Sequence, residues 1–166
     1  MTKDHLFRSL SASIGQSTVE PGSPTIGSSD IEASFHVMRR LQASRFFIAG
    51  KPAEPVFTLD SAVSEWLFAS GFWNQINNSL GTMFDQFEED EVEPAVLVQI
   101  ASDLDCRIRA LEIQGAEEVR FVCGWSSSGD SHAVKVRRTS LISQLAMLRS
   151  LLASAAANGE VLEFNL

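Results

Sequence analysis

The chain has a long central stretch without a basic residue. None of its 13 Lys and Arg lies between positions 52 and 106, whereas 11 of its 21 Asp and Glu do. The net charge at pH 7 is −8. Proteins that bind nucleic acids draw their affinity from clustered Lys and Arg, so this distribution excludes nucleic acid as the expected partner and favours a basic protein.

Cysteine is scarce as well, with two residues in the chain. Cys106 falls in a predicted helix and Cys123 in a predicted strand, and no CxxC or Cys/His spacing connects them. This spacing excludes the recognisable zinc and redox motifs. We expect both side chains to be small buried hydrophobic groups.

Long apolar runs and phosphate-binding motifs are absent. No uninterrupted run approaches the roughly 20 apolar residues that span a bilayer, and the N-terminal sequence MTKDHLFRSLSASIG lacks the apolar segment of a secretory signal. Neither GxGxxG nor GxxxxGK[ST] occurs. We therefore expect a cytoplasmic protein that binds neither a membrane nor a nucleotide cofactor.

The composition changes near residue 30. Residues 8–30 are rich in Ser, Gly, Thr and Pro and hold few apolar residues, so burial cannot offset the entropy of ordering them. This predicts a flexible N-terminal arm over residues 1–29 and a single domain over residues 30–166. The segment that opens the domain fits a helix, through the capping-box spacing of Ser29 and Glu32, and also a strand, through alternating apolar residues.

Apolar spacing predicts the helices beyond that segment. A first helix covers residues 61–80 and ends at Gly81, with a kink or a close helix contact at Gly71. A second begins at Pro94 and runs towards Gly115. A third begins at Ser140 and is closed by Asn158 and Gly159.

Short strands are predicted over residues 45–50 and 55–60, a hairpin over 117–139, and a final strand over 161–166. Together with the helices they predict an α+β fold, in which about three amphipathic helices cover one face of a mostly antiparallel sheet.

The most acidic segment is FDQFEEDEVEP, residues 84–94. A standard calcium loop requires glycine at the position that Asp90 occupies, so that motif fails. A surface run also rarely provides the burial that shifts a catalytic pKa, and the polar turn around Asp130 and His132 matches no known catalytic triad. We predict no catalytic residue, metal ligand or cofactor; the alternative is a small carboxylate-dependent metal-binding or hydrolytic enzyme that uses this block with Asp130 or His132.

Residues 60–166 resemble a family of small bacterial proteins. The resemblance rests on an apolar helix ending in LGTMFDQFEEDEVEP, a second helix, a short hairpin and a closing LISQLAMLRSLLASAAANGEVLEFNL. This order resembles the immunity proteins encoded beside antibacterial toxins of polymorphic, contact-dependent and type VI systems. The resemblance implies a non-catalytic protein that binds and neutralises a cognate basic toxin domain, such as a nuclease.

Within this interpretation the acidic segment forms the contact surface, with its carboxylates facing the Lys and Arg of the partner and Phe84 or Phe87 as an apolar anchor. The competing interpretation is a solvated loop between two helices. The predicted partner-binding residues are Phe84, Asp85, Phe87, Glu88, Glu89, Asp90, Glu91 and Glu93.

Overall fold

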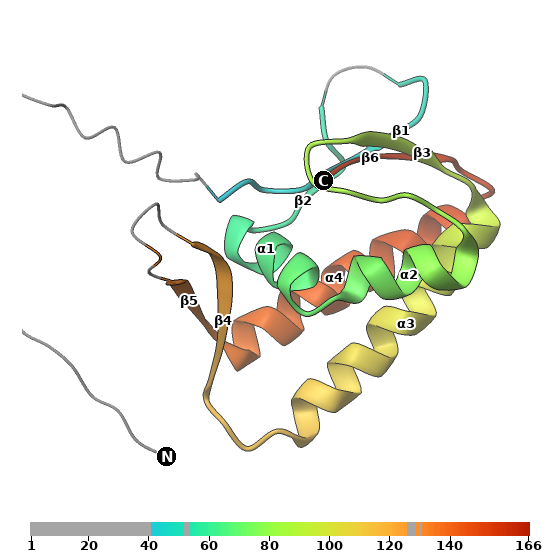
Figure 1. Ribbon diagram of the computed structural model, residues 1–166. Coiled ribbons are helices and arrows are strands. Elements are labelled where there is room, and N and C mark those ends of the chain that lie inside the picture. The colour runs from blue at the N-terminus through green and yellow to red at the C-terminus, as the bar shows by residue number, and fades with distance from the viewer. Residues whose placement is uncertain (1–40, 52–53, 126–128, 130) are drawn as a thin grey trace, which may run out of the picture. The chain divides into compact units, whose positions relative to one another are not determined.

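The computed structural model describes residues 41–51, 54–125, 129 and 131–166 (Figure 1). The chain divides into two units, residues 1–36 and residues 37–166, and the described residues all belong to the second. The arm predicted over residues 1–29, and the helix or strand predicted to follow it up to residue 40, lie outside the described residues.

Helices and strands alternate irregularly along the described chain, as expected of an α+β fold. The helices are α1 (Ser61–Ala69), α2 (Phe72–Leu80), α3 (Pro94–Ile113) and α4 (Arg138–Ala157). The strands are β1 (Arg45–Ile48), β2 (Phe57–Thr58), β3 (Glu89–Val92), β4 (Glu118–Trp125), β5 (Ser131–Arg137) and β6 (Leu162–Asn165).

The strands form two antiparallel sheets rather than the single sheet that the sequence predicts. The larger sheet has the order β2-β1-β6-β3, so that β3 is an edge strand among the described strands. The predicted hairpin is confirmed as β4 and β5, but it pairs only within itself among the described strands. Both of its strands contact α1 instead, apart from the larger sheet (Figure 1). The α+β class is confirmed, with the strands divided between two separate sheets.

One face of the larger sheet packs on the helices. Side chains alternate between the two faces of a strand, and the buried set comprises Phe46, Val92, Leu162 and Phe164. Their neighbours Arg45 and Glu91 are exposed. Figure 1 shows the helices on the buried side of this sheet.

Two long helices form the base of the core. The predicted second helix is confirmed as α3, which begins at Pro94 and buries a stripe that includes Leu97, Leu104 and Leu111. The third begins at Arg138, two residues before the expected Ser140. It packs along α3. By length and composition α4 could also cross a bilayer, a test that core helices of soluble proteins pass as well.

The helix predicted over residues 61–80 is broken in the middle. Gly71 lies between α1 and α2 with φ of 72°, in the left-handed region that side chains with a Cβ disfavour. Apart from its chain neighbours, no described residue lies within 4 Å of the place where its Cβ would be. The expected kink is therefore confirmed, and the close helix contact expected at the same residue is wrong.

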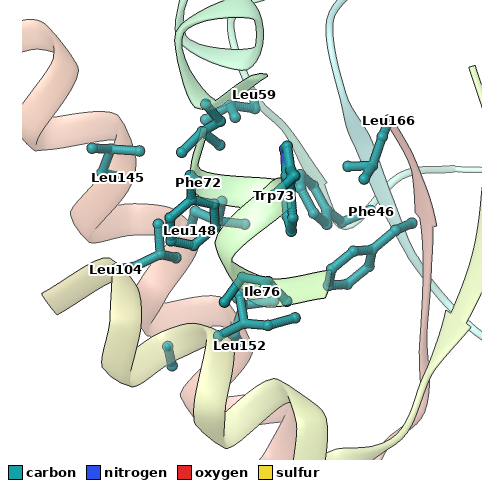
Figure 2. Packing of buried hydrophobic residues seen from close by; sticks show 14 of the residues in the cluster. Phe46, Leu59, Phe72, Trp73, Ile76, Leu104, Leu145, Leu148, Leu152 and Leu166 are labelled. Atoms are coloured by element: carbon teal, nitrogen blue, oxygen red, sulfur yellow. The ribbon is translucent and has the colours of Figure 1, made fainter. Parts of the chain in front are cut away.

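An aromatic cluster joins the helices to the sheet. Trp73 of α2 is 1% exposed, and the centroid of its ring lies 5.1 Å from that of Phe72 and 5.4 Å from that of Phe84. Phe164 of β6 continues the cluster at 5.8 Å from Phe84 and 4.9 Å from Phe46. Figure 2 shows Trp73 between the leucines of the long helices and the sheet. These contacts confirm Phe72 and Trp73 as core residues.

We expect Gly71→Ala to lower the free energy of unfolding by about 1–2 kcal/mol, the cost of a left-handed conformation for a residue with a Cβ. Gly115→Ala is the matched control, because Gly115 has no positive φ and also has open space at its Cβ position. Urea denaturation of both variants checks this. Equal midpoints for the two variants would contradict the role given to the Gly71 conformation.

Candidate functional site

The acidic segment is only partly a loop. Residues 81–88 lead from α2 to β3, and Glu89–Val92 pair with β6 along one edge of the sheet. Asp and Glu are depleted in strands, which is why the sequence predicts a loop here. Burial of Val92, which is 2% exposed, and the backbone ladder to β6 outweigh that preference.

Alternation along β3 separates its carboxylates. Glu89 and Glu91 are exposed on the face away from the helices. Asp90 lies on the same face as Val92, is only partly exposed, and its Oδ2 is buried without a hydrogen-bond partner among the described residues. The strand thus turns one carboxylate oxygen of Asp90 inwards, whereas the predicted contact residues on either side of it, Glu89 and Glu91, are exposed.

A third carboxylate, which sequence reasoning missed, joins the exposed pair. Glu163 of β6 lies directly opposite Glu91, and Glu89 lies opposite Asn165, whose Nδ2 donates to Glu89 Oε1 at 3.0 Å. We call Glu89, Glu91 and Glu163 the acidic sheet face. The alternation of apolar and polar residues in VLEFNL predicts that Glu163 points away from the core. That its neighbour is Glu91 follows only from the pairing of β6 with β3.

None of the three carboxylates of the acidic sheet face is in an ion pair within the described part of the chain, although Arg45 of β1 is exposed on the same face, opposite Asn165. The ion pairs there are Lys51 with Glu160 at 3.6 Å and Arg149 with Asp105 at 3.2 Å. Carboxylates directly opposite each other on a sheet destabilise it. Glu91 and Glu163 thus repel each other without a nearby ion pair to offset the repulsion.

Basic residues that follow the acidic block have other partners. The guanidinium of Arg138 donates to the carbonyl oxygens of Leu111, Glu112 and Ala116 at 2.8–3.3 Å, which ties the end of α3 to the start of α4. Arg107 donates to Gln75 Oε1 at 3.0 Å. These hydrogen bonds use the two cations for helix packing, and neither cation forms an ion pair with the acidic sheet face.

The loop before β3 is held by one side chain. Asn77 of α2 donates through Nδ2 to Phe84 O at 2.9 Å and accepts from Phe84 N at 2.8 Å and from Thr82 Oγ1 at 2.9 Å. Phe84 itself is 5% exposed and packs on Trp73. The prediction of Phe84 as a possible partner anchor is corrected, because its ring fills the core.

Several predicted contact residues do lie on the surface. Asp85, Glu88 and Glu93 are exposed, and Phe87 is 56% exposed. Met83, which the sequence did not single out, is 81% exposed. The structure thus brings together an acidic strand and an apolar-acidic loop that precedes it.

The described residues of the enzyme alternative are not brought together in one site. His132 is an exposed residue of β5, in a different sheet from the acidic strand, and Asp130 lies outside the described residues. Within the described ranges no group of three His, Cys, Asp or Glu is placed to hold a metal ion.

The two cysteines differ in their burial. Cys106 is exposed on α3, so its predicted burial is wrong: it lies beside the apolar stripe of that helix and not within it. Cys123 is half-buried, and its Sγ donates to His132 O at 3.3 Å.

A cleft of about 510 Å³ opens between β2 and α4, with Phe57, Leu59 and Met147 among its lining residues. Its carboxylate belongs to Asp60, whose Oδ1 accepts from Ala62 N at 2.9 Å and so caps α1. The amide of Asp60 donates to Gln144 Oε1 at 2.9 Å. These groups serve the start of a helix and give the cleft no catalytic pair.

We expect Glu91→Gln to raise the free energy of unfolding by about 0.2–1 kcal/mol at low ionic strength, since it removes repulsion from Glu163. The gain should shrink at high salt, which screens exposed charges. Glu112→Gln, on the exposed side of α3, controls for the lower net charge. Thermal unfolding at two salt concentrations measures both; a gain no larger than that of Glu112→Gln would contradict the repulsion.

We expect Asn77→Ala to lower the free energy of unfolding by about 1–3 kcal/mol, because it leaves the backbone groups of Phe84 without partners in a partly buried place. Asn78→Ala changes the adjacent, exposed amide. Hydrogen exchange of the Phe84 amide should accelerate only in the Asn77 variant. Equal exchange in the two variants would show that Asn77 does not hold the loop.

Comparison of the chain with protein-family models, with curated proteins and with solved structures found no match. The geometry of the acidic strand and its loop therefore carries the functional argument.

Proposed function

We propose that this domain is a non-catalytic binding protein whose acidic sheet face recognises a basic protein. The observation that carries the proposal is the pair Glu91 and Glu163, opposite each other in the ladder and not ion-paired within the described chain. A fold gains nothing from two carboxylates in this arrangement. Lys or Arg of a partner placed between them would offset the repulsion on binding.

The rigidity of the surface supports binding over a solvated loop. Glu89 and Glu91 belong to a strand paired with β6, and the preceding loop is held by the three hydrogen bonds of Asn77. A backbone that is already ordered loses little conformational freedom on association, so the ordering cost is limited to the side chains and more of the interaction energy appears as affinity. Their complementarity to a basic partner also raises the association rate.

The resemblance of residues 60–166 to immunity proteins favours one kind of partner. A toxin that cleaves nucleic acid has a basic substrate cleft, and a protein with fixed carboxylates can occupy that cleft in place of the substrate. We propose a cognate basic toxin domain, such as a nuclease, as the partner. The contact set of this proposal is Asp85, Phe87, Glu88, Glu89, Glu91, Glu93 and Glu163.

The edge position of β3 is consistent with this mode of contact. An exposed edge strand can pair with another strand, and charged residues on it oppose such pairing. Glu89 and Glu91 therefore disfavour addition of a strand from a second copy, whose equivalent edge carries the same charge. A partner that supplies cations is not repelled in this way.

The test compares two variants of equal charge. Glu91→Gln with Glu163→Gln alters the acidic sheet face, and Glu112→Gln with Glu117→Gln removes the same charge from exposed positions on and after α3. Proteins captured from the native cell by the immobilised wild-type chain are identified by mass spectrometry. Each captured protein is then purified and its affinity for both variants is measured.

We expect the first variant to bind a captured basic protein at least about tenfold more weakly than the second, a difference of about 1.4 kcal/mol. The difference should fall as salt rises from about 0.01 M to about 1 M, where the Debye length shrinks from about 30 Å to about 3 Å. Co-expression of wild-type chain with the captured protein should also restore growth if that protein is toxic. Equal affinity of the two variants at low salt would refute the proposal.

A further inference from the structure

The hairpin of β4 and β5 has one face towards the core and one face towards solvent. Val119, Phe121 and Val136 pack against the core. Side chains alternate along a strand, so the residues between these point the other way. The latter are all exposed and comprise Glu118, Arg120, Val122, Ala133, Lys135 and Arg137. We call this set, with its three cations and one carboxylate, the basic hairpin face.

Two of these cations lie directly opposite each other. Arg120 of β4 pairs with Lys135 of β5 in the ladder, and neither is in an ion pair within the described part of the chain. Like charges in this arrangement destabilise a sheet. Arg137 lies opposite Glu118, but their charged groups are not within ion-pair distance. The repulsion between Arg120 and Lys135 thus has no ion pair in the hairpin to offset it.

This cation pair repeats, with opposite charge, the arrangement of the carboxylates on the acidic sheet face. Glu91 and Glu163 are also directly opposite each other in an antiparallel ladder. Residues placed in this way have Cβ atoms about 4.5–5.5 Å apart. Each face carries one charge of the other sign, Glu118 on the hairpin and Arg45 on the larger sheet, which leaves each face with its own net sign. Two cations and two carboxylates at one spacing can form two ion pairs when the faces meet.

Each charged pair also has an apolar neighbour. Val122 follows Arg120 by two residues on the basic hairpin face and is 45% exposed. On the larger sheet, Phe47 of β1 lies opposite Glu163 and is partly exposed. Surface ion pairs alone contribute little to association. Contact between the two faces would also remove apolar area from water, which adds to the affinity.

One chain does not bring its own two faces together. The hairpin ends at Arg137, where α4 begins, and only four residues separate the end of α4 from β6. Figure 1 shows the hairpin beside the start of α4 and β6 beginning beside its end. The helix has 20 residues and is therefore about 30 Å long. That length exceeds the Debye length of about 8 Å at physiological salt, so the two faces of one chain hardly neutralise each other.

We propose that a second copy of this chain is the partner of the basic hairpin face, which docks on the acidic sheet face of that copy. The two faces are different surfaces, so the copies associate head to tail, and a dimer keeps one face of each kind unoccupied. The pairing of equivalent edges that Glu89 and Glu91 oppose is not required. Such docking goes beyond the proposed function, and a basic partner would compete with it for the acidic sheet face.

Nucleic acid is the less suitable occupant of the basic hairpin face. The net charge of the chain is −8, so the field of the whole protein repels phosphate. The same net charge opposes self-association at low salt. At about 0.15 M salt, charges in contact still attract while charges farther apart than about 8 Å are largely screened. We therefore expect self-association to be strongest near physiological salt and to weaken at about 1 M salt.

Charge reversal of each face tests the docking. One variant is Glu91→Lys with Glu163→Lys, and the other is Arg120→Glu with Lys135→Glu. Neither should associate with itself, because both of its charged pairs then have the same sign. An equimolar mixture of the two should associate, since each pair of one variant meets a pair of opposite sign on the other. The mean net charge of this mixture equals that of the wild-type chain.

Analytical ultracentrifugation at about 0.15 M salt measures these masses. We expect the mass of the wild-type chain and of the mixture to rise with concentration, and each reversed variant alone to have a Kd for self-association at least about tenfold higher. Glu54→Lys with Glu112→Lys is the control, because it reverses the same charge at exposed positions outside both faces. It should associate at least as strongly as the wild-type chain.

A neutral variant guards against a folding defect of the reversed hairpin. Arg120→Gln with Lys135→Gln removes the repulsion between the two strands, so its Tm should not fall. It should lose self-association and still bind a captured basic protein at least as tightly as the wild-type chain. Loss of self-association therefore does not affect the proposed function, which is tested by Glu91→Gln with Glu163→Gln.

Three results would overturn the docking. They are a wild-type chain that stays monomeric up to about 1 mM, a mixture of reversed variants that does not associate, and undiminished self-association of Arg120→Gln with Lys135→Gln. Binding of a DNA duplex by a monomeric wild-type chain, abolished in the same Gln variant, would assign the basic hairpin face to nucleic acid instead.

Discussion

The contact of Phe84 and Phe164 with Trp73 is the interaction on which the rest of this structure depends. Trp73 belongs to α2, Phe84 to the loop that follows it, and Phe164 to β6. Burial of these rings brings the end of the chain beside residues some 80 positions earlier. This contact helps to place β6 between β1 and β3, where the acidic strand joins its ladder.

The core thereby determines what the surface can do. Phe84 and Val92 are buried, and they fix the two ends of the acidic segment. The residues between them form the loop 85–88 and the strand β3. Two of the consequences are unfavourable for stability. The carboxylates of Glu91 and Glu163 lie opposite each other, and the backbone of Phe87 has a left-handed conformation. Phe87 and Glu91 lie four residues apart on one segment, and Glu163 joins them from β6.

Much of the secondary structure follows from local patterns. Pro94 and the leucine spacing predict α3, polar turn residues predict the hairpin, and Gly71 predicts the break between α1 and α2. The site is less predictable, since it depends on pairing between distant segments. Asp90 and Phe84 were predicted on the surface because their neighbours are charged, and the strand alternation and the aromatic cluster turn them inwards. Cys106 shows the opposite error, since one position around a helix separates burial from exposure.

The sequence by itself determined that the centre of this chain is strongly acidic, that its helices are amphipathic, and that the domain is α+β, because charge and apolar periodicity are properties of the linear order. Only the tertiary structure decided which carboxylates share a face. Glu163 becomes the neighbour of Glu91 through a strand pairing across some 70 residues, and the backbone of Phe87 is set by hydrogen bonds to Leu166. Such long-range contacts form because buried aromatic rings bring the segments together, and no local pattern specifies that meeting.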